Sequence, residues 1–150
     1  MSSHTTDTTL RKEWIGLLAR AKPLQLAALM AEAVVEPALL RAPEIGAVMV
    51  RGRVGATGAP FNLGEMTVTR CSVRLACGTV GHAYVQGRDR DHARRAAMLD
   101  ALMQTDAAED LRERVLVPLA QSEDEARRIR AAKAAATKVE FFTMVRGEDK

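Results

Sequence analysis

The chain has few aromatic residues: three Phe, one Tyr and one Trp among 150 residues. Its core must therefore be built from Ala, Leu, Val and seven Met, which an apolar fraction of 47% can supply. Aromatic side chains also provide the stacking platforms that bind single-stranded nucleic acid, and the formal net charge is only +3. These shortages argue against a nucleic-acid-binding protein, and at this length we expect one domain over residues 1–150.

Cysteine is also scarce. Cys71 and Cys77 lie six residues apart without a CxxC motif, and the three histidines do not cluster with them. This pattern predicts no metal site, and two small buried thiols fit a reducing compartment. Residues 1–9 are polar, and no run reaches the roughly 18 apolar residues that a membrane span needs. We therefore expect a cytoplasmic protein without a membrane segment, with disorder at residues 1–7.

Familiar catalytic motifs are missing as well. The chain contains no G-x-S-x-G and no H-E-x-x-H sequence. His82 has no obvious nucleophile beside it along the chain, and His92 lies among charged residues at an expected helix start. Glu44 is a single carboxylate, which is not enough for acid–base catalysis. We therefore predict no catalytic residue in this chain.

The first third of the chain has helical periodicity. Apolar residues recur on one helical face at Leu10, Trp14, Leu17, Leu18 and Ala21. A hydroxyl at position 8 or 9 can cap this helix, and a proline at position 23 suits the start of a second helix. A helical hairpin is predicted, ending near residue 36 before two prolines.

A period of two begins at Glu44 and predicts strands over residues 44–54, 65–76 and 79–86, with a glycine-bearing loop over 55–64. The apolar residues of the second strand change parity, so we expect a β-bulge near Thr69 and Arg70. Phe61 in the loop is open to two interpretations: an anchor for a partner, or a ring folded back onto its own sheet.

Helices and a short final strand are predicted for the remainder. Asp89 can cap a helix that ends near residue 105, and Pro118 should stop the short helix that follows. Ser122 and Glu125 form an S-x-x-E capping box, which predicts a last helix up to residue 137. The expected fold is α+β: a small antiparallel sheet of three to four strands, flanked by an N-terminal helical hairpin and C-terminal helices.

The strongest local signal for binding is the turn after the third strand. Gly87 allows a sharp turn, and Arg88 and Arg90 lie beside a helix start whose free N–H groups can hold an anion. Asp89 supports the other interpretation, a helix that is simply capped, and both stay open. If the chain contacts a polyphosphate substrate, the candidate residues are Arg70, Gln86 and Arg88.

The segment 138–147 is apolar and strand-prone, and it follows a helix whose thin apolar stripe offers little core. Chain ends fray unless something holds them. We therefore expect this tail to be buried at a sheet edge or against another chain. The predicted interface residues are Phe141, Phe142, Met144 and Val145.

Three separated segments, FNLGEMTVTR (61–70), GHAYVQGRD (81–89) and VEFFTMVRG (139–147), together resemble the G subunit of the carbon–phosphorus lyase core complex, the PhnG family of phosphonate metabolism. The Arg-x-x-Trp pattern of Arg11 and Trp14 also fits this family. The similarity extends over about residues 10–148, which is nearly the whole chain.

The resemblance implies a bacterial protein of phosphonate catabolism. In that family the G, H, I and J subunits form a core complex with two copies of each. With an ATP-binding-cassette-like L subunit, the G, H and I subunits convert ATP and methylphosphonate into α-D-ribose 1-methylphosphonate 5-triphosphate and adenine.

The nucleosidase-like chemistry is placed on the I subunit in this family, so the resemblance implies a transferase subunit that I requires. It also implies that this chain binds no cofactor of its own, while ATP is a co-substrate of the complex. The alternative is a nucleotide- or phosphonate-binding adaptor that takes no part in the chemistry.

Overall fold

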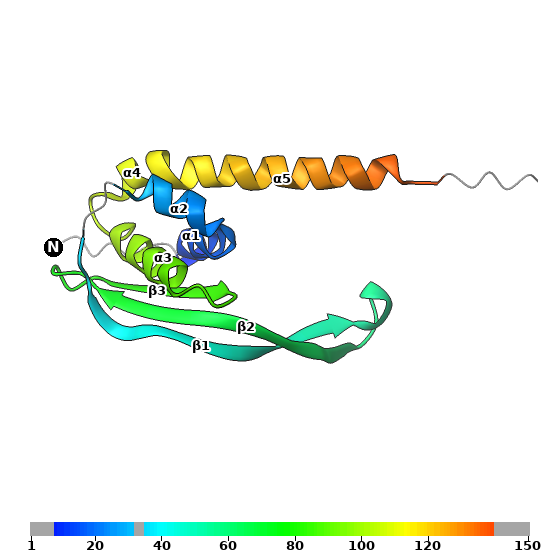
Figure 1. The fold of residues 1–150 in the computed structure, drawn as a ribbon, viewed down its shortest axis with the longest axis horizontal. Helices are drawn as coiled ribbons and strands as arrows, with labels where there is room; N and C mark the ends of the chain where they lie inside the picture. Colours follow the sequence, from blue (N-terminus) through cyan, green and yellow to red (C-terminus); the bar gives the residue numbers. More distant parts are fainter. Residues whose placement is uncertain (1–7, 32–34, 140–150) are drawn as a thin grey trace, which may run out of the picture.

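The computed structural model describes residues 8–31 and 35–139, which form a three-stranded antiparallel sheet with helices (Figure 1). The strands are β1 (Ala38–Arg53), β2 (Pro60–Arg74) and β3 (Val80–Gln86), in the spatial order β1-β2-β3. The helices are α1 (Thr8–Arg20), α2 (Pro23–Leu29), α3 (Arg90–Leu102), α4 (Ala108–Leu111) and α5 (Val117–Ala136). The predicted α+β class is confirmed.

The core lies between the sheet and α3, which crosses one face of it (Figure 1). Cys71 of β2 and Val85 of β3 point to this helix and are at most 1% exposed. A Cβ atom at Gly81 would run into the backbone of Ala97 and Ala101, so the helix approaches β3 more closely than any side chain there would allow. The small alanine side chains of α3 therefore permit this close packing.

The predicted N-terminal helical hairpin is present as α1 and α2. Pro23 lies in the first turn of α2, where its missing N–H group costs no helical hydrogen bond. Trp14 and Leu18 of α1 and Leu26 of α2 are buried in the core, whereas Leu10 is 43% exposed. The predicted apolar face of α1 is therefore buried over its later turns but not at its start.

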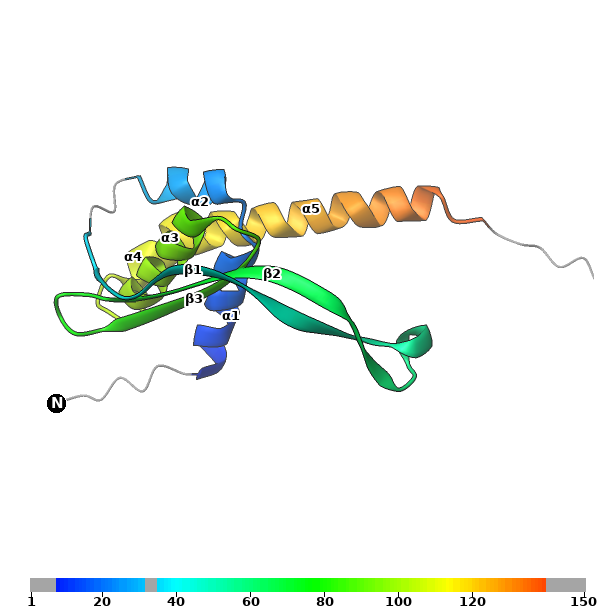
Figure 2. The same cartoon turned by 60° about the horizontal axis from the view of Figure 1, so that its bottom comes forward.

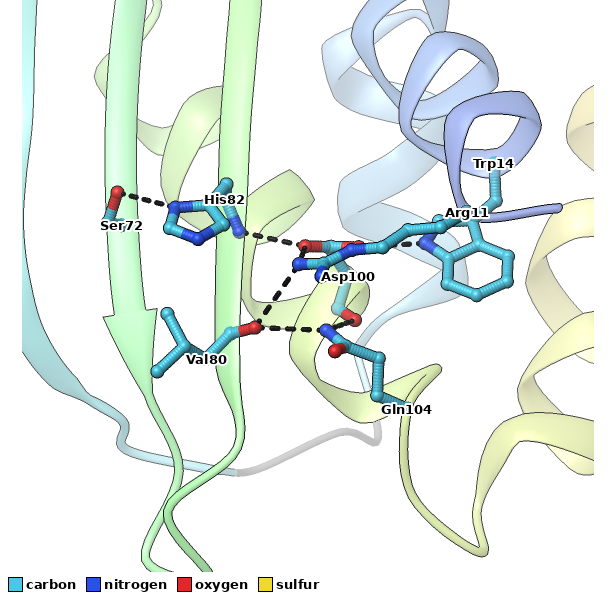
Figure 3. Close-up of polar contacts among 7 residues, drawn as sticks. All are labelled: Arg11, Trp14, Ser72, Val80, His82, Asp100 and Gln104. Atoms are coloured by element: carbon cyan, nitrogen blue, oxygen red, sulfur yellow. Dashed lines mark hydrogen bonds and ion pairs between the residues drawn. The ribbon is translucent and has the colours of Figure 1, made fainter. Parts of the chain in front are cut away.

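One buried carboxylate connects α1, α3 and the sheet (Figure 3). Asp100 of α3 is 0% exposed and accepts four hydrogen bonds. Two come from Arg11, Nε to Oδ1 at 3.1 Å and Nη2 to Oδ2 at 2.7 Å. The indole Nε1 of Trp14 donates to Oδ1, and the backbone N–H of His82 donates to Oδ2, both at 2.8 Å. The Arg-x-x-Trp pattern of α1 thus supplies donors to a single carboxylate.

These contacts also cover the outer edge of β3. The N–H and C=O groups of an edge strand need partners that no neighbouring strand provides. Asp100 takes the N–H of His82, and the carbonyl of Val80 accepts from Gln104 Nε2 at 2.9 Å and from Arg11 Nη2 at 3.3 Å. Side chains therefore occupy the place of a fourth strand beside β3.

The predicted start of the first strand at residue 44 is wrong, because β1 begins at Ala38. Proline is tolerated in an edge strand, and the β1–β2 register shifts between Arg41 and Glu44, on either side of Pro43. The bulge predicted in β2 near Thr69 and Arg70 is wrong in its strand: β2 pairs with β3 without a shift, and the irregularity opposite Arg70 has its extra residue in β1.

The predicted glycine loop of residues 55–64 is shorter than expected. A 3-10 turn, Val54–Ala56, follows β1, and β2 already starts at Pro60. Phe61 is paired with Gly52 of β1, and its ring lies about where a side chain at Gly52 would make van der Waals contact. Of the two interpretations of Phe61, the structure has the ring folded back onto its own hairpin, where it is still 42% exposed.

The predicted stop at Pro118 and the helix start at Ser122 are both wrong. A π-helical turn, Arg112–Leu116, leads from α4 directly into α5, which begins at Val117 with Pro118 in its first turn. Pro118 therefore lies in a continuous helical run, directly after the π-helical turn, and that irregular turn accommodates a residue whose ring and missing N–H group would disrupt a regular α-helix. Ser122 and Glu125 consequently lie inside α5 rather than at a cap.

Two parts of the chain extend beyond the body on the same side (Figures 1 and 2). We call residues 47–53 and 60–67, with the turn between them, the distal hairpin: here β1 and β2 pair with each other but not with β3. We call residues 127–139 the helical arm, because α5 docks on the body through Leu119 and an Arg20–Glu123 ion pair of 2.7 Å and is exposed from residue 127 onward.

The predicted disorder of residues 1–7 and most of the predicted tail, including Phe141, Phe142, Met144 and Val145, fall outside the described residues. Lys138 and Val139, which are described, follow α5 without strand structure. Among the described residues, no helix is both long and apolar enough to cross a membrane.

The Asp100 contacts predict the largest single-residue stability loss in the body. Asp100→Ala leaves the Arg11 guanidinium, the Trp14 indole and the His82 amide without their acceptor, and should lower the free energy of unfolding by about 3–5 kcal/mol. Asp124→Ala on the exposed side of α5 should change it by less than about 0.5 kcal/mol. Urea unfolding of the two variants measures the difference, and equal losses would show that the network does not stabilise the fold.

Candidate functional site

The sheet face opposite α3 carries polar side chains from all three strands, and no described helix lies across it (Figure 1). Cross-strand pairing arranges these side chains in two adjacent rows. The first row is Arg41, Ser72 and His82, and the second is Glu44, Arg70 and Tyr84. Directly paired residues project from the same face of a sheet, so the six side chains are neighbours.

Glu44 holds the two arginines of these rows. Its Oε2 atom accepts from Arg41 Nη1 at 2.7 Å and from Arg70 Nη2 at 3.2 Å. The hydrogen bond from Arg41, followed by the charge of Arg70, lowers the pKa of Glu44 below that of an ordinary glutamate. One negative charge thus faces two positive ones, and the group keeps a net positive charge.

Ser72 and His82 form a hydrogen-bonded pair across β2 and β3, with 3.0 Å between Ser72 Oγ and His82 Nδ1 (Figure 3). The backbone N–H of the same histidine binds Asp100, so the buried network fixes the strand position from which this ring projects. The pair therefore presents a hydroxyl and an imidazole at a fixed place on an open surface.

Two hollows adjoin this face, and Tyr84 lines both. We call the first the arginine hollow, which has a volume of about 250 Å³. It is lined by Arg41, Arg70, Ser72, His82 and Tyr84, by Ile15 of α1, and by residues adjacent to these in β2 and β3. We call the second the end groove: it has about 520 Å³ and lies where the end of α1 approaches the end of β3 and the start of α3. Its polar lining includes Arg20, Gln86, Arg88 and Asp89.

The structure brings two of the three predicted substrate-contacting residues together. Gln86 and Arg88 both line the end groove, whereas Arg70 lies in the arginine hollow, across Tyr84 from them. Asp89 caps α3 as predicted, accepting from the backbone N–H of His92 at 2.8 Å. Arg88 is exposed at the groove and makes no ion pair with any described residue.

Arg41 and the Ser72–His82 pair are the side chains here that sequence reasoning did not find. Arg41 lay before the expected start of the first strand. Ser72 and His82 are ten residues apart, and their meeting depends on strand register, which the parity of each strand alone does not fix. The shared outward parity of His82 and Tyr84 was the one available signal.

Cys71 contributes to the lining of the arginine hollow, whereas Cys77 lines neither hollow. Cys71 is buried against α3, and burial raises the pKa of its thiol. Cys77 is exposed in the β2–β3 turn, where a hydrogen bond with Thr79 Oγ1 at 3.3 Å lowers the pKa of its thiol. The described part of the chain contains no group of three or more His, Cys, Asp or Glu side chains that could hold a metal ion.

Comparison with known proteins gives a match over almost the whole chain. Residues 9–147 match the model of a family described as phosphonate metabolism protein PhnG. The chain is also 48% identical to the alpha-D-ribose 1-methylphosphonate 5-triphosphate synthase subunit PhnG of Rhizobium meliloti (strain 1021), with 99% of this chain and 96% of that protein aligned. The arginine hollow, the end groove and both extended parts fall within the matched residues.

The contacts of Arg41 and Arg70 with Glu44, which we call the two-arginine clamp, predict how the pKa of Glu44 responds to substitution. Because this pKa is lowered, the clamp is complete at pH values above the ordinary carboxyl range. It is lost only as the pH falls through the pKa of Glu44 in the folded protein. Arg41→Gln, and to a smaller extent Arg70→Gln, should raise the pKa of Glu44, whereas Arg74→Gln on the same strand should leave it unchanged. Carboxyl ¹³C NMR titration measures this pKa. An unchanged pKa of Glu44 in both Arg41→Gln and Arg70→Gln would contradict the assignment.

Proposed function

The chain belongs to the PhnG family of phosphonate metabolism proteins, and we propose that it is a subunit of α-D-ribose 1-methylphosphonate 5-triphosphate synthase in the carbon–phosphorus lyase core complex. In the reaction proposed for the complex, a phosphonate oxygen forms a bond to C1′ of the ATP ribose as the bond from C1′ to adenine breaks. The phosphonate loses a proton and adenine gains one. ATP is then a co-substrate of the complex, and this chain needs no cofactor of its own.

We place the catalytic centre on the I subunit, with this chain as its partner. The observation that supports this is the pair of extended parts, which bury little within the chain. An isolated two-stranded hairpin is marginally stable in water, yet the distal hairpin exposes Met49, Val54 and Leu63 by more than half of their surfaces. Such surfaces are typical of an element that packs against another protein.

The helical arm supports the same proposal. Residues 127–139 contain five arginines and lysines and no acidic residue, and Ile129 is 47% exposed. Its Ala, Arg and Lys residues favour a helix. Most helical stability in proteins comes from packing an apolar face, however, and the described residues of this chain give the arm no surface to pack on. We propose that the arm and the tail after it, residues 138–147, contact the I subunit through an acidic surface with an apolar strip. Contacts with the H, J and L subunits, in a core with two copies of each core subunit, complete the proposed assembly.

The first expected outcome concerns dependence on partners. The purified chain should release no adenine from ATP and methylphosphonate, and a mixture of the other subunits should release it only when this chain is added. Removing residues 138–150 should abolish co-purification with the I subunit, while removing residues 1–7 should not. Adenine release by the chain alone, or normal assembly without the tail, would contradict the proposal.

The second expected outcome concerns the end groove, where we propose that Arg88, with Gln86, binds the polyphosphate of ATP. Loss of one charge-assisted hydrogen bond costs about 1.5–3 kcal/mol, so Arg88→Ala should slow adenine formation by roughly 10- to 100-fold. Arg90→Ala, which removes the same charge two residues away and does not line the groove, should have little effect. Both variants should assemble normally, and an unchanged rate for Arg88→Ala would remove it from the site.

A nucleotide-binding adaptor is the second candidate function, and the volume of the end groove favours it. If that function holds, the isolated chain binds ATP saturably, and Arg88→Ala weakens the binding without affecting the rate of the assembled enzyme. A rate effect in the assembled enzyme supports the first proposal instead.

A further inference from the structure

We propose that the arginine hollow is a binding site for a phosphate or phosphonate dianion, held by Arg41 and Arg70 with the Ser72–His82 pair. The inference concerns this chain alone. It needs neither the partner subunits nor the synthase reaction, and so it goes beyond the proposed function. It also places an anion away from the end groove, on the far side of Tyr84.

The first support is the convergence of donors from all three strands. Arg41, Ser72 and His82 are consecutive partners across β1, β2 and β3, and Arg70 with Tyr84 occupies the next row. All five side chains line one hollow of about 250 Å³. Guanidinium groups bind the oxygens of phosphate and phosphonate with paired N–H donors, and hydroxyl groups complete such sites.

The second support is the state of the two arginines. Both are held by Glu44 from one side, and their side chains remain 50% and 44% exposed. A single carboxylate cannot use all the donors of two guanidinium groups, since each guanidinium has five N–H groups. Glu44 therefore orients the two cations and leaves donors of both for a ligand.

The third support is the Ser72–His82 pair. When Ser72 donates to Nδ1, the neutral ring carries its proton on Nε2, which has no hydrogen bond among the described residues. That N–H group can donate to an oxygen of the ligand. The Asp100 network holds the histidine backbone from behind, so the donor is in place before the ligand arrives.

The experiment is an isothermal calorimetric titration of the full-length chain with methylphosphonate and, separately, with inorganic phosphate. Arg41→Gln and Arg70→Gln should each weaken binding by about tenfold or more, as expected for one charge-assisted contact. Arg74→Gln is the matched control, because it removes the same charge from β2 outside the hollow. Glu44→Gln should tighten binding, since the glutamine keeps an oxygen that can orient the arginines and removes the negative charge that competes with the anion.

A second measurement needs no variant. The ring ¹H–¹³C NMR signal of His82 should shift on addition of either anion, and the order of affinities shows whether phosphonate or phosphate is preferred. Competition by ATP would assign the hollow to a phosphate chain, and lack of competition to the smaller anion. An unchanged chemical shift of the His82 ring at saturating anion would overturn the site. So would a loss of affinity in Arg74→Gln equal to the losses in Arg41→Gln and Arg70→Gln. Either result would leave the partner dependence of the synthase unaffected.

Discussion

The structure depends on how one buried carboxylate is satisfied. A buried charge is costly unless it is paired and hydrogen-bonded, and Asp100 meets both conditions with donors from α1 and β3. The same contacts close the edge of β3, which would otherwise be left open. One residue therefore fixes the position of the first helix, the approach of α3 to the sheet, and the strand that carries His82 and Tyr84.

This arrangement gathers the helices on one face and one edge of the sheet and leaves the other face open (Figure 1). The polar rows on that face are thus supported from behind by a packed core, which suits a surface that binds anions. By contrast, the distal hairpin and the helical arm have no core behind them. The molecule combines a stable body with two extensions, a division that fits a family whose known members include a subunit of a larger synthase.

Local sequence signals predicted the features that depend on neighbours along the chain: the α+β class, Pro23 at a helix start, the third strand and the Asp89 cap. They were wrong where position in the fold overrides local preference. Pro43 is accommodated because β1 is an edge strand, and the capping box of Ser122 is unused because α5 had already begun. The Asp100 network and the Ser72–His82 pair join residues far apart in sequence, so strand register and helix packing had to be known first. A lone acidic residue among the buried positions of α3 was the available hint of the network.

Hydrogen–deuterium exchange of the chain, alone and with the I subunit, tests the central claim most directly. In the isolated chain, amides of α3 and β3 should exchange slowly, while those of the distal hairpin and of residues 127–139 exchange quickly. Adding the I subunit should protect both extensions and leave the body unchanged. Fast exchange throughout the extensions in the presence of the I subunit would contradict the account of this chain as a partner-dependent subunit.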